Sequence, residues 1–114
     1  MERDRETIGL TPRSQQIIAE IEARGWFREG QDIAKFALGH AVRSHLAEGQ
    51  TSGTDTRWNA GSFDKTGEIR AVLQALYPDC RTPVRLMEHF VNEGLRLIEE
   101  RVRAGGATAA DLLD

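Results

Sequence analysis

The stretch RDRETIGLTPRSQQII, residues 3–18, begins with a segment that alternates like a β-strand. Side chains of an extended chain point to opposite faces in turn, which places Ile8 and Leu10 on one face and Arg5 and Thr7 on the other. A strand of this length needs a partner, because alone it leaves its backbone hydrogen bonds unmade. The identity of that partner decides the fold.

Four helices are predicted along the chain. Thr11 offers a hydroxyl that can cap a helix, and Pro12 suits the first helical position because its missing N–H group is not needed there. Apolar spacing and end signals predict helices over residues 12–24, 29–47, 66–77 and 83–103. The third has the clearest amphipathic pattern, formed by Ile69, Val72, Leu73 and Leu76. The sequence therefore predicts a mainly α-helical fold with one short strand.

A chain of 114 residues is expected to form a single domain with one core. Trp58 and Phe63 lie in a stretch rich in Gly, Ser, Thr and Asn, and we expect them to anchor it to the core. The predicted parts are a strand and two helices at 3–47, a loop at 48–64, two helices at 65–103 and a flexible tail at 104–114.

The composition indicates a soluble globular protein. Hydrophobic residues make up 39% and charged residues 29%, and no stretch approaches the roughly 18 apolar residues of a membrane span. The charged start of the chain does not resemble a secretory signal, so a cytoplasmic location is expected. The single cysteine, Cys80, is expected to be a partly buried thiol.

The charge balance counts against a strongly basic nucleic-acid binder. The formal net charge is -3, whereas proteins that neutralise phosphates normally carry a basic surplus. The positive charge is almost all arginine, with 13 Arg and 2 Lys. Because the planar guanidinium suits phosphates, carboxylates and guanine edges, a local DNA-binding patch is compatible with this composition.

The second predicted helix, 29–47, is apolar around most of its circumference, which is typical of a buried helix. The first helix and one strand offer little surface to cover it. We therefore expect a second copy of the chain to cover it. The alternative within one chain is that the C-terminal half wraps around this helix.

The segments ETIGLTPRSQQIIAEIEARGWF, residues 6–27, and DIAKFALGHAV, residues 32–42, resemble the ribbon-helix-helix family of repressors and antitoxins. The resemblance implies that two chains each contribute a strand to an antiparallel ribbon that enters the DNA major groove, while the second helices pack the dimer. It implies an intertwined homodimer with an interface at Ile8, Leu10, Ile33, Phe36, Ala37 and Ala41.

The chain departs from this family at Gly9, which occupies an outward strand position where a base-reading side chain is expected. The residues after the loop also fit a repressor less well. The layout of such a half followed by two helices is similar to the small helical protein of DNA phosphorothioation systems, a likeness of arrangement without a shared residue motif.

For DNA binding, the ribbon-helix-helix resemblance makes Arg3, Arg5 and Thr7 face the groove. Arg13, Arg28 and Gln31 would then lie near phosphates, the last of them at a helix start where free N–H groups attract anions. The alternative is that these side chains are solvated surface and the strand serves only to form the dimer.

Catalytic and metal-binding patterns are not found. His40 and His45 are five residues apart on one predicted helix, a rotation of about 140 degrees, so they cannot share a metal from that helix. Glu88 and His89 are adjacent and point in different directions, and no HExxH, GxSxG, Walker or dinucleotide pattern occurs. The segment DKTGE, residues 64–68, is expected to be a helix-entry turn. Neither a metal nor a cofactor is predicted.

The sequence thus favours a small non-enzymatic DNA-binding or DNA-associated accessory protein, either a ribbon-helix-helix-like regulator or a component of a DNA-modification or defence system. Its expected partners are further copies of itself, in a homodimer or higher oligomer, together with double-stranded DNA and an unidentified protein. The alternative is a homo-oligomeric interaction or assembly module that does not bind DNA.

Overall fold

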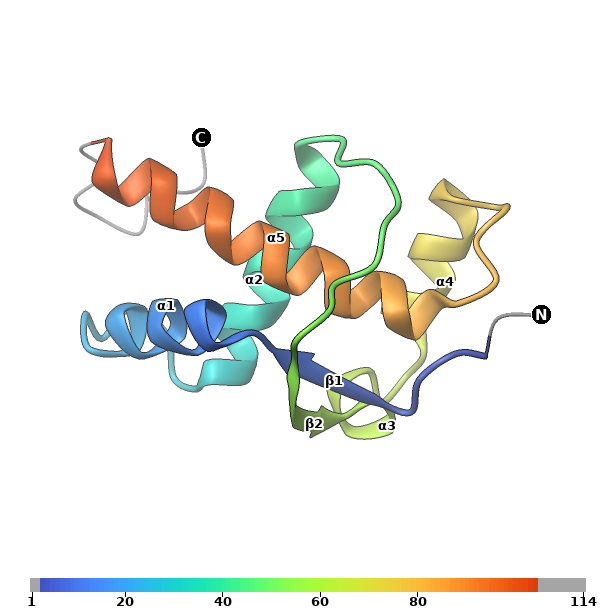
Figure 1. Ribbon diagram of the computed structural model, residues 1–114, viewed down its shortest axis with the longest axis horizontal. Coiled ribbons are helices and arrows are strands. Elements are labelled where there is room, and N and C mark those ends of the chain that lie inside the picture. Colours follow the sequence, from blue (N-terminus) through green and yellow to red (C-terminus); the bar gives the residue numbers. More distant parts are fainter. Residues whose placement is uncertain (1–2, 105–114) are drawn as a thin grey trace.

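The computed structural model describes residues 3–104, which form a mainly α-helical globule with one small antiparallel sheet (Figure 1). The elements are β1 (Thr7–Leu10), α1 (Pro12–Glu22), α2 (Gly30–Arg43), β2 (Asp55–Asn59), α3 (Ala60–Phe63), α4 (Glu68–Leu76) and α5 (Pro83–Arg103). The mainly helical prediction is confirmed. Within these residues no helix is long and apolar enough to cross a membrane. Of the predicted tail, residues 105–114 lie outside the described residues.

The start of α1 is formed as the sequence predicts. The Thr11 hydroxyl accepts a hydrogen bond from the Ser14 N–H group at 3.1 Å, and Pro12 occupies the first turn. Helix α2 is shorter than predicted and ends at Arg43, because the chain turns at His45 with a φ of 57°. A positive φ of this kind ends a helix.

The predicted loop at 48–64 contains both β2 and α3, which is a correction to the sequence interpretation. Strand β1 pairs with β2 of the same chain, from Thr7 opposite Asn59 to Leu10 opposite Asp55. The prediction that β1 pairs with its own copy is therefore wrong for this fold. Strand β2 lacks an apolar alternation because its side chains are mostly exposed, and its pattern therefore does not predict a strand.

Helix α5 runs across the molecule and contacts α2, α1, α4 and β1 (Figure 1). Its closest approach is to α2, where a Cβ atom at Gly94 would lie 2.0 Å from the carbonyl oxygen of Ala37. Only glycine permits this separation of the two backbones. The C-terminal half thus covers α2, as the single-chain alternative predicts.

The core of one chain contains most of the residues that the resemblance assigns to a dimer interface. Five of them are fully buried, namely Ile8, Leu10, Ile33, Ala37 and Ala41. Phe36 is partly buried and packs on Phe27 with ring centroids 5.4 Å apart. Trp58 and Phe63 do anchor the β2–α3 segment, with ring centroids 5.5 Å apart. A second copy could not reach the five buried side chains without opening the fold.

The close contact between α2 and α5 predicts opposite effects of one substitution at two helical glycines. Gly94→Ala should lower the free energy of unfolding by about 1–3 kcal/mol, because the added methyl group meets the α2 backbone. Gly39→Ala on α2 should raise it by about 0.5–1 kcal/mol, since the nearest group is a flexible arginine tip 4.0 Å away. Urea unfolding measures both, and equal effects would contradict the contact.

Candidate functional site

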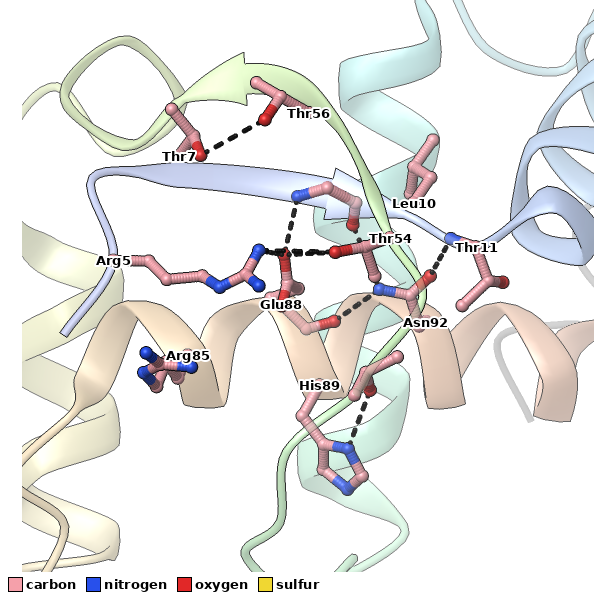
Figure 2. A network of polar contacts seen from close by, with 12 residues as sticks. Arg5, Thr7, Leu10, Thr11, Thr54, Thr56, Arg85, Glu88, His89 and Asn92 are labelled. Atoms are coloured by element: carbon pink, nitrogen blue, oxygen red, sulfur yellow. Dashed lines mark hydrogen bonds and ion pairs between the residues drawn. The ribbon is translucent and has the colours of Figure 1, made fainter. Parts of the chain in front are cut away.

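A buried carboxylate on α5 lies directly beneath β1 (Figure 2). Glu88 is 1% exposed, and its Oε2 atom accepts hydrogen bonds from the Gly9 N–H group at 2.9 Å and the Thr54 hydroxyl at 3.2 Å. The Arg5 guanidinium donates to the same oxygen at 3.0 Å. Two of these donors come from the N-terminal segment and one from the connection before β2, and together they compensate the burial of the charge.

One helical turn further along α5, Asn92 satisfies the next part of the same strand edge. Its amide nitrogen donates to the Gly9 carbonyl oxygen at 3.1 Å, and its Oδ1 atom accepts from the Thr11 N–H group at 3.0 Å (Figure 2). Side chains of α5 therefore occupy the edge of β1 that β2 leaves open. A strand from another molecule would have to displace Glu88 and Asn92 to pair there.

Several side chains that were expected to contact DNA have partners within the fold. Arg5 is bonded to Glu88, and Arg13 forms an ion pair with Glu99 on α5. The Thr7 hydroxyl lies 3.5 Å from the hydroxyl of Thr56 on the neighbouring strand. These side chains therefore stabilise the protein itself.

The other three expected DNA contacts lie elsewhere. Arg3 is exposed, and its carbonyl oxygen accepts a hydrogen bond from the Arg85 guanidinium at 2.8 Å. Arg28 is exposed in the turn before α2, and Gln31 is half-buried in the first turn of α2. Arg28 and Gln31 thus both lie at the start of α2.

The acid–base candidates do not converge on one site. Glu88 points towards β1, whereas His89 points to the other side of α5, where its Nδ1 atom lies 2.9 Å from the Thr51 hydroxyl (Figure 2). His40 is buried at the end of α2 and His45 is exposed. Among residues 3–104 no group of three or more His, Cys, Asp or Glu residues could hold a metal ion.

The segment 64–68 forms the helix-entry turn that the sequence predicts. The Asp64 carboxylate accepts hydrogen bonds from the N–H groups of Ile69 at 3.0 Å and Arg70 at 3.1 Å, and from the Arg70 guanidinium at 2.9 Å. Burial alone would raise the Asp64 pKa, but these hydrogen bonds and the positive charge of Arg70 outweigh it and lower the pKa below its ordinary value. Asp64 is therefore a structural cap of α4.

A hollow of about 330 Å³ lies between α2 and the segment that joins α3 to α4. Polar side chains line it: Gln31 and Lys35 on α2, Ser62 on α3, and Lys65 and Thr66 on the joining segment. We call it the lysine hollow. Asp64, Glu68, Phe63 and Ile69 complete its lining. Both lysines of the chain line this one hollow.

Neither lysine forms an ion pair with a carboxylate in the described part of the chain. The Lys35 ammonium lies 5.4 Å from the centroid of the Phe63 ring, a contact that attracts the cation without neutralising it. The exposed Arg57 lies beside the first turn of α2, with a guanidinium nitrogen 3.7 Å from the position of a Cβ atom at Gly30.

Arg28, Gln31, Lys35, Arg57 and Lys65 therefore gather around the start of α2, and we call them the basic surface. The acidic residues Glu22, Glu29, Asp32 and Glu68 are also exposed there, and the Glu22 Oε2 atom lies 3.7 Å from the same Cβ position at Gly30 as Arg57 does. Sequence reasoning singled out Arg28 and Gln31 but missed Lys35, Arg57 and Lys65. The sequence signal for the two lysines was that lysine occurs only twice in the chain. The two positions are 30 residues apart, and the fold brings them to one hollow.

A second hollow, of about 400 Å³, lies beside Cys80, which is partly buried as predicted. Its lining carries charges of both signs, including Glu48, Asp79 and Arg81. With two carboxylates against one guanidinium, this lining does not favour an anion. In the lysine hollow, Asp64 is already bonded to Arg70, which leaves two lysines against one uncompensated carboxylate.

Two histidines, the buried His40 and the half-buried His89, predict a pH-dependent stability. Burial, followed by the positive charges of Arg43 and Arg101, lowers the pKa of His40 below its ordinary value. Burial also lowers the pKa of His89, against the opposing charge of Glu93. Between the lowered pKa and the ordinary value of 6.5, the unfolded chain binds more protons than the folded one. Stability should therefore fall as the pH falls below about 6.5.

His40→Gln should make this loss of stability on acidification shallower, because one of the two imidazoles with a lowered pKa is removed. His45→Asn is the matched control, since His45 is exposed and asparagine tolerates the positive φ found there. Urea unfolding over a series of pH values measures the slope. If the dependence of stability on pH is unchanged in His40→Gln, the burial of His40 does not cause the loss of stability on acidification.

In comparisons with known proteins, no protein-family model, no curated protein and no solved structure matches the chain.

Proposed function

We propose that this protein is a small DNA-associated accessory protein without a catalytic role, which contacts the phosphates of double-stranded DNA through the basic surface. The observation that carries the proposal is the contrast between its cations. Five arginines, Arg5, Arg13, Arg70, Arg96 and Arg103, are held by carboxylates. Lys35 and Lys65 have no such partner within residues 3–104.

Unpaired cations can take the place of the counterions that surround DNA, and the release of those ions favours binding. The free N–H groups at the start of α2 add a favourable field for an anion next to Lys35, although Glu29 and Asp32 oppose it. Because the whole protein is acidic, we expect weak binding that is lost readily as salt increases.

The proposed contact differs from that of the ribbon-helix-helix family, in which the strand enters the major groove. Strand β1 is held between β2 and α5, and Arg5 is bonded to Glu88. The start of α2 contacts the backbone instead, a contact that positions a protein on DNA without reading its sequence. A transcriptional regulator and a component of a DNA-modification or defence system both need such a contact, so both roles remain within the proposal.

The proposal predicts that Lys35→Gln/Lys65→Gln weakens duplex binding and flattens its salt dependence. Each lost phosphate contact should reduce the slope of log K against log salt by about 1, so the double variant should lose about 2. Arg96→Gln is the matched control, because Arg96 is exposed on α5 and already paired with Glu93 and Glu100. Fluorescence anisotropy of a labelled duplex measures the binding.

The wild-type protein should bind the duplex at about 50 mM salt and bind it much less tightly at about 200 mM. Absence of binding at low salt would refute the proposal. Equal binding by the wild type and the double lysine variant would refute the assignment of the surface.

A second candidate function, a homo-oligomeric assembly module, is favoured by one face of α4. Ala71, Val72, Ala75 and Leu76 are all exposed and form an uncharged stripe; Val72 is 52% and Leu76 53% exposed. Val72 and Leu76 are the exposed large hydrophobic residues among residues 3–104. An uncharged stripe with two alanines lets two copies of the same helix approach closely about a two-fold axis without like-charge repulsion.

This candidate predicts that the protein dimerises and that Leu76→Glu makes it monomeric, because the new charge would be buried between two copies. Gln74→Glu is the matched control, since it adds the same charge on α4 away from the stripe. Light scattering over a wide range of protein concentration measures the mass. A monomeric wild type at every concentration would exclude the assembly module.

A further inference from the structure

We propose that the lysine hollow is a seat for a single phosphate group, held between Lys35 and Lys65. The inference deepens the proposed function and rests on it, because the same surface makes the DNA contact. The phosphate could belong to a nucleic-acid backbone or to a free phosphate compound. Both sources present the same tetrahedral group of oxygens, and the experiment below separates them.

Hydrogen-bond donors for a phosphate stand on both walls of the lysine hollow. Lys35 and the Gln31 amide stand on α2, whereas Lys65 stands on the segment between α3 and α4. The hydroxyls of Ser62 and Thr66 lie on this second wall. Two ammonium groups, an amide and two hydroxyls can reach several oxygens of a tetrahedral anion, whereas a planar carboxylate has only two.

The wall that carries Lys65 is held in place by its own hydrogen bonds. The Gly67 N–H group donates to the Asp64 carbonyl oxygen at 3.1 Å, and Gly67 has a φ of 76° that favours glycine. The Thr66 Oγ1 atom accepts from the Glu68 N–H group at 3.3 Å, which leaves its own proton free to be donated. The turn therefore does not have to be ordered when an anion binds.

The two carboxylates in the lining differ in their effect. Asp64 has a 2% exposed side chain, and both of its oxygens are engaged by α4, including the Arg70 guanidinium. Its charge is therefore compensated before any ligand enters. Glu68 is exposed and has no ion-pair partner in the described residues, so it opposes an anion. Within the lining, the balance is positive, with two lysines against one uncompensated glutamate. Glu29 and Asp32, exposed at the start of α2 outside the lining, also oppose an anion.

The lining also favours the phosphate over other parts of a nucleotide. Phe63 is fully buried, so its ring cannot serve as a stacking platform for a base. Its contact with the Lys35 ammonium, at 5.4 Å, holds the cation at the wall. We therefore expect recognition of the charged group with little preference among bases or between DNA and RNA.

The first arm of the test is a titration of isotopically labelled protein with inorganic phosphate at low ionic strength, followed by NMR. Saturable shifts are expected for the amides of residues 62–66 and for Gln31 and Lys35. Lys35→Gln and Lys65→Gln should each weaken binding about tenfold, as expected for a charge-assisted contact. Glu68→Gln should tighten it, and Arg96→Gln should leave it unchanged. A melting curve for each variant verifies folding.

The second arm adds inorganic phosphate to the complex with a labelled duplex. If phosphate displaces the duplex at concentrations that saturate the lysine hollow, the natural source is the nucleic-acid backbone. If phosphate saturates the lysine hollow and the duplex stays bound, the source is a free phosphate compound. Both results support the phosphate seat.

Two results would overturn the phosphate seat: an absence of saturable shifts in the folded wild type, or phosphate binding that survives in both lysine variants. Duplex binding without phosphate binding would remove the seat and leave the proposed function standing. Phosphate binding without duplex binding would remove the proposed function and leave the seat standing, with a free phosphate compound as its ligand.

Discussion

The fold depends on the hydrogen bonds through which α5 closes the open edge of β1. A buried carboxylate such as Glu88 costs several kcal/mol unless donors replace its water. Arg5 supplies a donor from just before β1, Gly9 from within β1 and Thr54 from the connection before β2. The N-terminal segment binds α5 at a second place, because the Asp4 carboxylate accepts the N–H groups of Val84 and Arg85 and so caps the helix. These segments are therefore stable only when assembled together.

The position of α5 then determines how α2 is buried. With β1 fixed along α5, Gly94 meets the backbone at Ala37, and the apolar surface of α2 is covered without a second molecule. The expectation of an intertwined dimer came from the assumption that one chain lacks the surface to cover this helix. Any assembly of this protein has to use other surfaces, such as the exposed stripe on α4.

Local signals predicted the helices well. The Thr–Pro starts and the apolar spacing located α1, α4 and α5, because caps and periodicity depend on neighbouring residues. Strand β2 was not predicted, because its stability comes from pairing with β1 and not from an apolar face. The bonding of Glu88 to Gly9 and the shared hollow of Lys65 and Lys35 were not predicted for a related reason: the residues of these pairs lie 79 and 30 positions apart. No local pattern encodes such pairs.

Arg5 and Arg70 differ from the two lysines in how their charges are compensated. A guanidinium presents several donors in one plane, which suits the fixed carboxylate partners of Arg5 and Arg70. An ammonium is a compact, strongly hydrated charge that stays in water when no partner is provided, as at Lys35 and Lys65. On a protein of net charge -3, most of the surface repels a polyanion. Attraction can then act only where unpaired cations are close together, and that condition makes the lysine hollow the place where a phosphate would be held.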